Sequence, residues 1–133
     1  MKTATLVIPF DSVAAGTAEE LYVAIPWLGK WLVEYVAIAP NTALATAATN
    51  YTTVLLTASD GAGGDDSGTI AAYTSNTSGA GSIALVLKTV VAPTVTQPAA
   101  VLRRGHIFKL AKADTGTGQA HDACWTIGLR KVG

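Results

Sequence analysis

The sequence predicts an all-β fold, an antiparallel β-sandwich of about eight strands that forms a single domain over residues 1–133. The clearest observation is the stretch 123–131, where Trp125, Ile127 and Leu129 fall on one face of an extended chain. Alternation with a period of two is typical of a strand with one buried face. The second observation is that similar apolar segments recur at fairly even spacing with turn residues between them, as in all-β sandwiches.

The expected strands follow from these apolar segments, and the Pro, Gly, Asn and Asp residues between them predict the turns. We expect strands at residues 3–10, 21–25, 30–39, 51–58, 69–73, 83–91, 106–113 and 123–131. Thr17 and Glu20 have the spacing of a helix capping box, but the β-rich run that Pro26 closes favours a strand there. The alanine-rich stretch 42–49, with Asn41 as its cap, could form the one short helix.

The stretch 30–39 is the longest strand candidate, and simple alternation divides it into two faces. Trp31, Val33 and Tyr35 would face one way, and Leu32, Glu34, Val36 and Ile38 the other. Because both faces are mostly apolar, we expect a partner chain or another layer to cover the second one. Glu34 within that face would need a lysine or arginine as its partner.

The composition points to association. Half of the residues are hydrophobic and only 14% are charged, so much of the surface must be apolar or uncharged. A surface of this kind predicts that partner chains cover part of it, which favours a homo-oligomer; a Thr- and Ala-rich β surface with few ions is the alternative. The net charge is zero, and the basic residues look scattered, with Arg103-Arg104 and Arg130-Lys131 as the densest pairs. This argues against nucleic acid as a partner.

The sequence also bears on where the protein works. Its one cysteine, Cys124, excludes an internal disulfide and fits a reducing compartment. No stretch approaches the length of an apolar membrane helix, so we expect no membrane partner. The apolar run up to Phe10 is too short for a signal peptide and is broken by Pro9 and Asp11, so we expect no general secretory export.

No set of residues predicts catalysis, a metal site or a cofactor site. The loop 60–68 carries three aspartates but lacks the ligand spacing of a calcium loop, and we interpret it as a solvated hairpin loop. The two histidines and the cysteine match no metal motif, and two aspartates flank a glycine-rich loop as turn formers. We therefore expect structural roles for His106, His121, Cys124, Asp114 and Asp122, and we expect no enzyme activity.

The aromatic residues are the remaining candidates for binding. Trp27, Trp31, Tyr35 and Trp125 form a large aromatic set for a chain of this size. They could form a sugar-stacking platform, or they could anchor the core and a subunit interface, which we favour. Our candidate interface residues are Trp27, Trp31, Tyr35, Arg103 and Arg104.

The order of these features resembles a known group of proteins. A first strand Thr5–Phe10 is followed by Val23-Ala24-Ile25-Pro26 and a long apolar strand, then by the turn Arg103–Leu110, and the chain closes on a strand with Arg130, Lys131 and Val132. This pattern resembles the small β-sandwich structural proteins of tailed bacteriophages, of the capsid decoration or head-fibre type. The Gly105-His106-Ile107 turn and the loop 115–119 are also similar to trimeric jelly rolls of the tumour-necrosis-factor and C1q kind.

The resemblance implies a jelly-roll-like sandwich, in which the first and last strands pair and Leu6 and Ile8 lie beside Ile127 and Trp125. It implies a non-enzymatic virion protein, assembled in the host cytoplasm, that binds the outer surface of the major capsid protein shell, as a trimer by preference. It carries over no functional residue. The alternative is a receptor- or carbohydrate-binding module of a tail fibre or spike.

Overall fold

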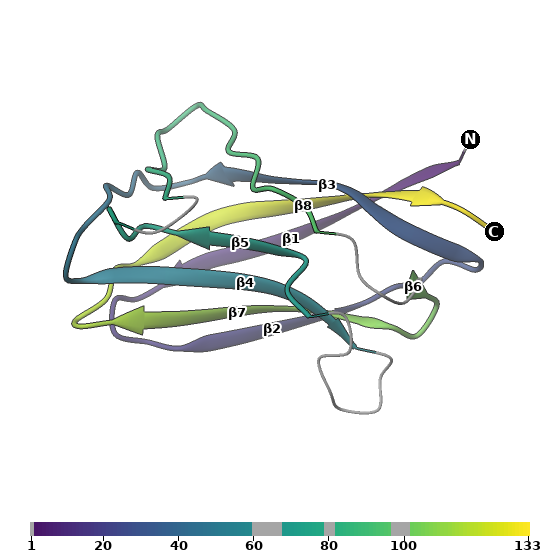
Figure 1. The fold of residues 1–133 in the computed structure, drawn as a ribbon, viewed down its shortest axis with the longest axis horizontal. Helices are drawn as coiled ribbons and strands as arrows, with labels where there is room; N and C mark the ends of the chain where they lie inside the picture. The colour runs from purple at the N-terminus through teal and green to yellow at the C-terminus, as the bar shows by residue number, and fades with distance from the viewer. Residues whose placement is uncertain (1, 60–67, 79–81, 97–101) are drawn as a thin grey trace.

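The computed structural model describes residues 2–59, 68–78, 82–96 and 102–133, which form two antiparallel four-stranded sheets facing each other (Figure 1). The strands are β1 (Thr3–Val13), β2 (Glu19–Ala24), β3 (Lys30–Pro40), β4 (Tyr51–Ser59), β5 (Ala71–Thr74), β6 (Leu102–Arg103), β7 (Ile107–Thr115) and β8 (His121–Lys131). The described residues contain no helix, and so none that could span a membrane. The predicted antiparallel β-sandwich of about eight strands is confirmed.

One sheet has the strand order β1-β8-β3-β6 and the other β2-β7-β4-β5, which is a jelly-roll arrangement. We call the first the terminal sheet, because it holds both ends of the chain. In its β1–β8 pair, Leu6 lies opposite Ile127 and Ile8 opposite Trp125, as predicted. Trp125, Ile127 and Leu129 are fully buried between the sheets, so the predicted core face of the last strand is also confirmed.

The β1–β8 pairing also determines which backbone groups of β1 stay free. The Lys131 N–H donates to the Lys2 carbonyl, so the even-numbered residues of β1 direct their backbone groups toward β8. The odd-numbered residues direct theirs to the open edge of the sheet. Pro9 is one of these, and its missing N–H therefore falls on the unpaired side, where proline is tolerated in a strand.

A bulge in β3 overturns the simple alternation predicted for 30–39. The pairing register with β8 shifts between Val33 and Tyr35, which leaves Glu34 as an extra residue. Val36 and Ile38 therefore turn to the same face as Val33, and all three are at most 1% exposed. Tyr35 and Glu34 are exposed instead. Since the bulge gathers the apolar residues on one face, this strand needs no covering layer on the other.

Two other expectations change in the second half of the chain. The predicted strand 83–91 is wrong: this segment makes only single bridges, of Leu85 with Leu44 and of Val91 with Ile38. Leu85 and Val91 are buried and Ile83 is partly buried against the core, whereas the other residues of the run are exposed, so the apolar run is not buried on both faces. The eighth strand is instead β6, where the sequence predicted a turn. Residues 42–49 form no helix, because buried Leu44 pairs with Leu85 in extended conformation.

A buried lysine on β7, Lys112, forms hydrogen bonds with the β1–β2 loop. The Lys112 ammonium lies inside the sandwich, where Asp114 accepts from it at 2.6 and 2.8 Å. It also donates to the carbonyls of Ala14 and Thr17, at 3.2 and 3.0 Å. All three ammonium protons thus find acceptors, as a buried charge requires.

We predict that Lys112→Met destabilises the fold by about 3 kcal/mol, because it removes the ammonium that neutralises Asp114 and donates to two buried carbonyls. Urea unfolding followed by tryptophan fluorescence measures the change. Lys88→Met removes an exposed lysine and is the matched control, expected within about 0.5 kcal/mol of the unsubstituted chain. Equal stability of the two variants would contradict the role given to Lys112.

Candidate interaction site

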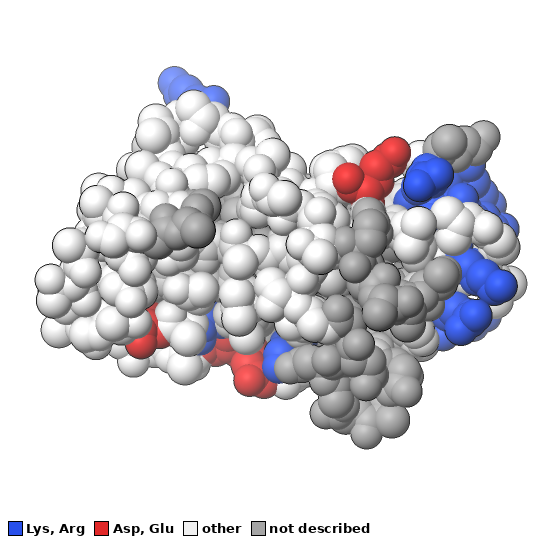
Figure 2. Space-filling model, in the orientation of Figure 1, with Lys and Arg blue, Asp and Glu red and all other residues white. Residues whose placement is uncertain are grey.

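Strand topology collects the cations at one end of the sandwich, which we call the basic end. β6 pairs there with the start of β3, so that Lys30 lies opposite Arg103. The last residues of β8 lie on the other side of β3, where Arg130 is opposite Leu32. Both termini, β6 and the start of β3 meet at this end (Figure 1). In the space-filling view, most of the blue surface gathers there (Figure 2).

The net charge of zero conceals this separation. The basic end holds six of the nine lysines and arginines: Lys2, Lys30, Arg103, Arg104, Arg130 and Lys131. The strand order puts five of the six described acidic residues toward the opposite end: Asp11, Glu19, Glu20, Asp114 and Asp122. The sixth, Glu34, is in the β3 bulge, whereas Asp60, Asp65 and Asp66 lie outside the described residues.

The two charged ends act independently at physiological salt. β3 has 11 residues and runs from one end to the other, about 35 Å at about 3.3 Å per residue. Screening reduces interactions beyond about 8 Å at 0.15 M salt, so a partner at the basic end meets an essentially positive surface. The interpretation of the basic residues as scattered is therefore wrong for the folded chain.

Local contacts hold the cations in place although they repel each other. Lys30 and Arg103 lie directly opposite on paired strands, an arrangement that costs stability. Gly29 has a φ of 96°, and a Cβ there would lie 2.6 Å from Lys131 Cε, so the lysine stem packs across the glycine. The Lys30 N–H donates to the Gly133 carbonyl at 2.8 Å. A fold that keeps close like charges on paired strands suggests a use for them outside the fold.

Apolar residues stand beside these cations in the β2–β3 loop. Leu28 is 70% exposed, while its carbonyl accepts from Trp31 Nε1 at 3.0 Å. Trp31 itself is 2% exposed and lies in the core. Trp27 is half-buried against it, with ring centroids 5.7 Å apart. The two rings pack as an extension of the core rather than as a pair of exposed platforms, and Leu28 is the exposed apolar residue of this loop.

The five candidate interface residues therefore have different positions. Arg103 and Arg104 are exposed at the basic end, Trp27 is half-buried there, and Trp31 is a core residue. Tyr35 lies on the outer face of the terminal sheet, opposite Gly128. A Cβ on Gly128 would come within 2.0 Å of the Tyr35 ring, so the ring covers the glycine. Its exposed remainder, 45%, continues the basic end along the sheet.

The sequence analysis missed Lys2, Lys30, Arg130 and Lys131 as members of this surface. The sequence does contain a signal for three of them, Lys2, Arg130 and Lys131. The predicted pairing of Leu6 with Ile127 already implies, by counting outward, that Lys2 lies opposite Lys131 and next to Arg130. No sequence spacing indicates that β6 joins Arg103 to Lys30, because Leu102–Arg103 is too short for a strand pattern.

The residues with catalytic chemistry do not converge. No group of three or more His, Cys, Asp and Glu lies close enough to hold a metal ion within the part of the chain that the structure describes. Cys124 is half-buried on the outer face of the terminal sheet. His106 lies in the turn after β6, where its backbone N–H donates to the Arg103 carbonyl and its own carbonyl accepts from the Ile25 N–H.

Asp114 and Asp122 bind neighbouring groups rather than each other. Burial alone would raise the pKa of Asp114, but hydrogen bonds from Lys112 and Thr52 and the charge of Lys112 lower it. The Asn41 side chain donates to Asp122 at 3.1 Å and is the main cause that lowers the pKa of that carboxyl. Asp122 also accepts from the Thr42 hydroxyl, so it fastens the turn after β3.

His121 is the one buried histidine, and it belongs to an aromatic cluster in the core. Its ring lies against Phe10, Tyr73 and Trp125, with centroid distances of 5.6, 5.5 and 6.2 Å. Trp125 Nε1 can only donate, so His121 Nε2, 3.1 Å away, must accept and the ring is neutral with its proton on Nδ1. Burial, with the nearby charge of Lys112, lowers the pKa of His121 to about 4.

No family model, no curated protein and no solved structure matches this chain.

We predict a loss of stability in mild acid that originates at His121. Its pKa is about 4 in the fold and 6.5 in its ordinary state, so the unfolded chain binds the proton more readily. Stability is complete above pH 6.5 and falls by about 3 kcal/mol as the pH drops to 4. Urea titrations across this range measure it.

His121→Phe removes the titrating group and is expected to flatten the profile between pH 6.5 and 4, at lower overall stability because Trp125 Nε1 loses its acceptor. His106→Gln, which replaces the histidine outside the core, keeps the slope of the unsubstituted chain. Asp114 and Asp122 have an ordinary pKa of 3.8 that the fold lowers, so the stability that they contribute is lost below about pH 4. An unchanged slope in His121→Phe would contradict the assignment.

Proposed function

We propose that this chain is a non-enzymatic virion structural protein, a capsid decoration protein that binds the outer surface of the shell formed by a major capsid protein. The observation that carries the proposal is the basic end, where six cations gather on a chain with no net charge. Such a surface suits a partner that offers carboxylates over an extended area. In this proposal the protein acts mechanically, adding contact area that holds neighbouring subunits of the shell together.

The chemistry of the basic end favours a protein partner. Leu28 and Val132 are 70% and 41% exposed next to the cations, so the surface combines charge with aliphatic groups. A nucleic-acid surface would rely on cations along a groove and on stacking rings, whereas the tryptophans here turn inward. Arginines and exposed apolar residues are typical of the centres of protein interfaces.

The placement of the termini fits binding at a surface. Both lie at the basic end in the terminal sheet, so the opposite end and the second sheet are directed away from the partner (Figure 1). We propose that the chain binds as a homo-oligomer, a trimer by preference, because several basic ends on one particle would act together. Linked sites of this kind raise the apparent affinity without any new contact.

We predict that Lys30→Glu with Arg103→Glu lowers binding to capsids of the phage that encodes the chain at least tenfold. The double variant reverses two exposed cations at the centre of the surface, and binding by the unsubstituted chain weakens between about 0.05 and 0.5 M salt for the same reason. Co-sedimentation with capsids stripped of the protein measures both effects.

Lys109→Glu reverses a lysine on β7, outside the basic end, and is the control that keeps binding. A chain that ignores capsids at low salt would overturn the proposed function. Capsid binding that neither salt nor the double variant changes would overturn the role of the basic end alone.

A further inference from the structure

The segment that fails to form a strand carries a cluster of exposed aliphatic side chains. Val86, Leu87 and Val90 are 54%, 50% and 68% exposed, and together we call them the loop tip. In Figure 1 this loop, coloured between teal and green, stands out beyond β3, and Figure 2 shows the corresponding protrusion. Its exposed side chains are the same residues that suggested a buried strand in the sequence.

Backbone hydrogen bonds hold the loop tip in one conformation. At its base, Leu85 exchanges two backbone hydrogen bonds with Leu44, of 2.8 and 2.9 Å, and Val91 exchanges two with Ile38, of 2.9 and 2.7 Å. Within it, the Thr89 N–H donates to the Val86 carbonyl at 3.2 Å, and the Thr89 hydroxyl donates to the same oxygen. Lys88 has a φ of 64°, an uncommon conformation for a residue with a side chain. A preformed tip loses little freedom when it binds.

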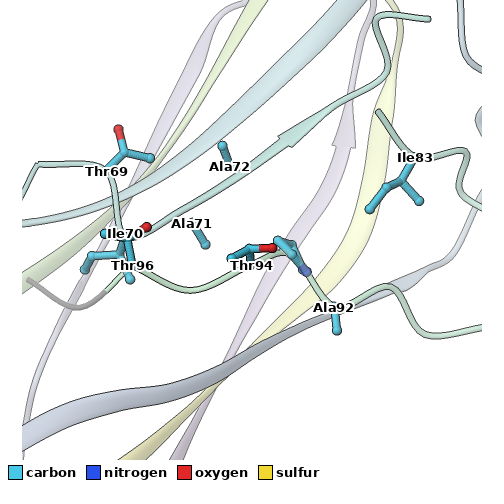
Figure 3. A pocket seen from close by; sticks show the side chains of 9 residues that line it. Thr69, Ile70, Ala71, Ala72, Ile83, Ala92, Thr94 and Thr96 are labelled. Carbon is cyan, nitrogen blue, oxygen red and sulfur yellow. The ribbon is translucent and has the colours of Figure 1, made fainter. Parts of the chain in front are cut away.

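A pocket lies immediately beside this loop, between β5 and the segment 92–96 (Figure 3). Two backbone hydrogen bonds join the segments on either side of it, from Thr96 N to the Ile70 carbonyl at 2.7 Å and from Ile83 N to the Thr74 carbonyl at 3.2 Å. It has a volume of about 380 Å³. Its lining has three threonines and six apolar residues: Ile70, Ala71, Ala72, Ile83, Ala92 and Pro93. We call it the edge pocket.

We propose that the loop tip of one copy of this chain binds in the edge pocket of a second copy. None of the described residues that line the pocket is charged, so the pocket favours an aliphatic group over an ion. Val86, Leu87 and Val90 supply such groups, and their own neighbours leave them uncovered. Lys88, which is exposed between Leu87 and Thr89, would keep its ammonium in solvent when the tip binds. Copies of a chain with zero net charge also approach without overall repulsion.

The positions of the two features on the chain determine how copies can assemble. The segment 82–96 contributes both the loop tip and one wall of the edge pocket, so every copy carries a donor and an acceptor side by side. Two copies can exchange loop tips about a twofold axis, or successive copies can close a ring such as the proposed trimer. The basic end lies elsewhere, so the contact between copies is independent of capsid binding.

Paired variants test the proposal with the purified chain alone. Leu87→Asp with Val90→Asp places charge on the loop tip, and Thr94→Glu places charge in the edge pocket; these residues are exposed, so the fold is preserved. Val7→Asp makes the same change at an aliphatic residue that is 61% exposed on the terminal sheet. Light scattering after size exclusion gives the mass of each species across concentration.

We expect the unsubstituted chain and Val7→Asp to associate with the same midpoint, and each of the other two variants to shift it at least tenfold toward monomer. Mixed together, these two variants regain a species of two chains, because one retains an intact pocket and the other an intact tip. A monomeric unsubstituted chain at about 1 mM, association that persists in either variant, or a mixture that stays monomeric would each overturn the proposal. Capsid co-sedimentation, measured separately, tests the proposed function.

Discussion

The antiparallel pairing of β1 with β8 is the contact on which the rest of the structure depends. It joins the two most distant parts of the chain, and it places Ile8 and Trp125 opposite each other at the centre of the core. The same register puts Lys2 next to Lys131, so the pairing that builds the core also builds part of the basic end. Core and surface are thus coupled through one register, and a slip of one residue would exchange their side chains.

Much of the fold could be predicted because β8 follows a simple rule. β8 alternates apolar and polar residues without interruption, so both its buried face and its pairing with β1 could be derived from the sequence. β3 breaks the rule at Glu34, where one extra residue reverses the alternation. In a straight strand, Val33 and Val36 would lie on opposite faces. In a bulged strand, the same sequence places both on one face. Only the pairing partner distinguishes them.

The candidate site could be predicted only in part, because the order of the strands in the sheet brings its residues together. Arg103 and Arg130 are far apart in sequence, and each belongs to a short basic pair that carries no signal of its own. They come together because β6 and β8 flank the same end of β3. The edge pocket and the loop tip arise in a similar way, from a segment whose composition indicates a strand but which pairs with Leu44 and Ile38 only through single bridges.

Pro9 gives the terminal sheet a property that matters when many copies are crowded on one surface. β1 is the open edge of this sheet, and an open edge of 11 residues is a template on which further chains can polymerise into fibrils. Pro9 removes one donor from the unpaired row, so a strand added to this edge would leave an acceptor unmatched. The sheet can therefore stay four strands wide at high local concentration, and growth of an assembly is left to contacts between side chains.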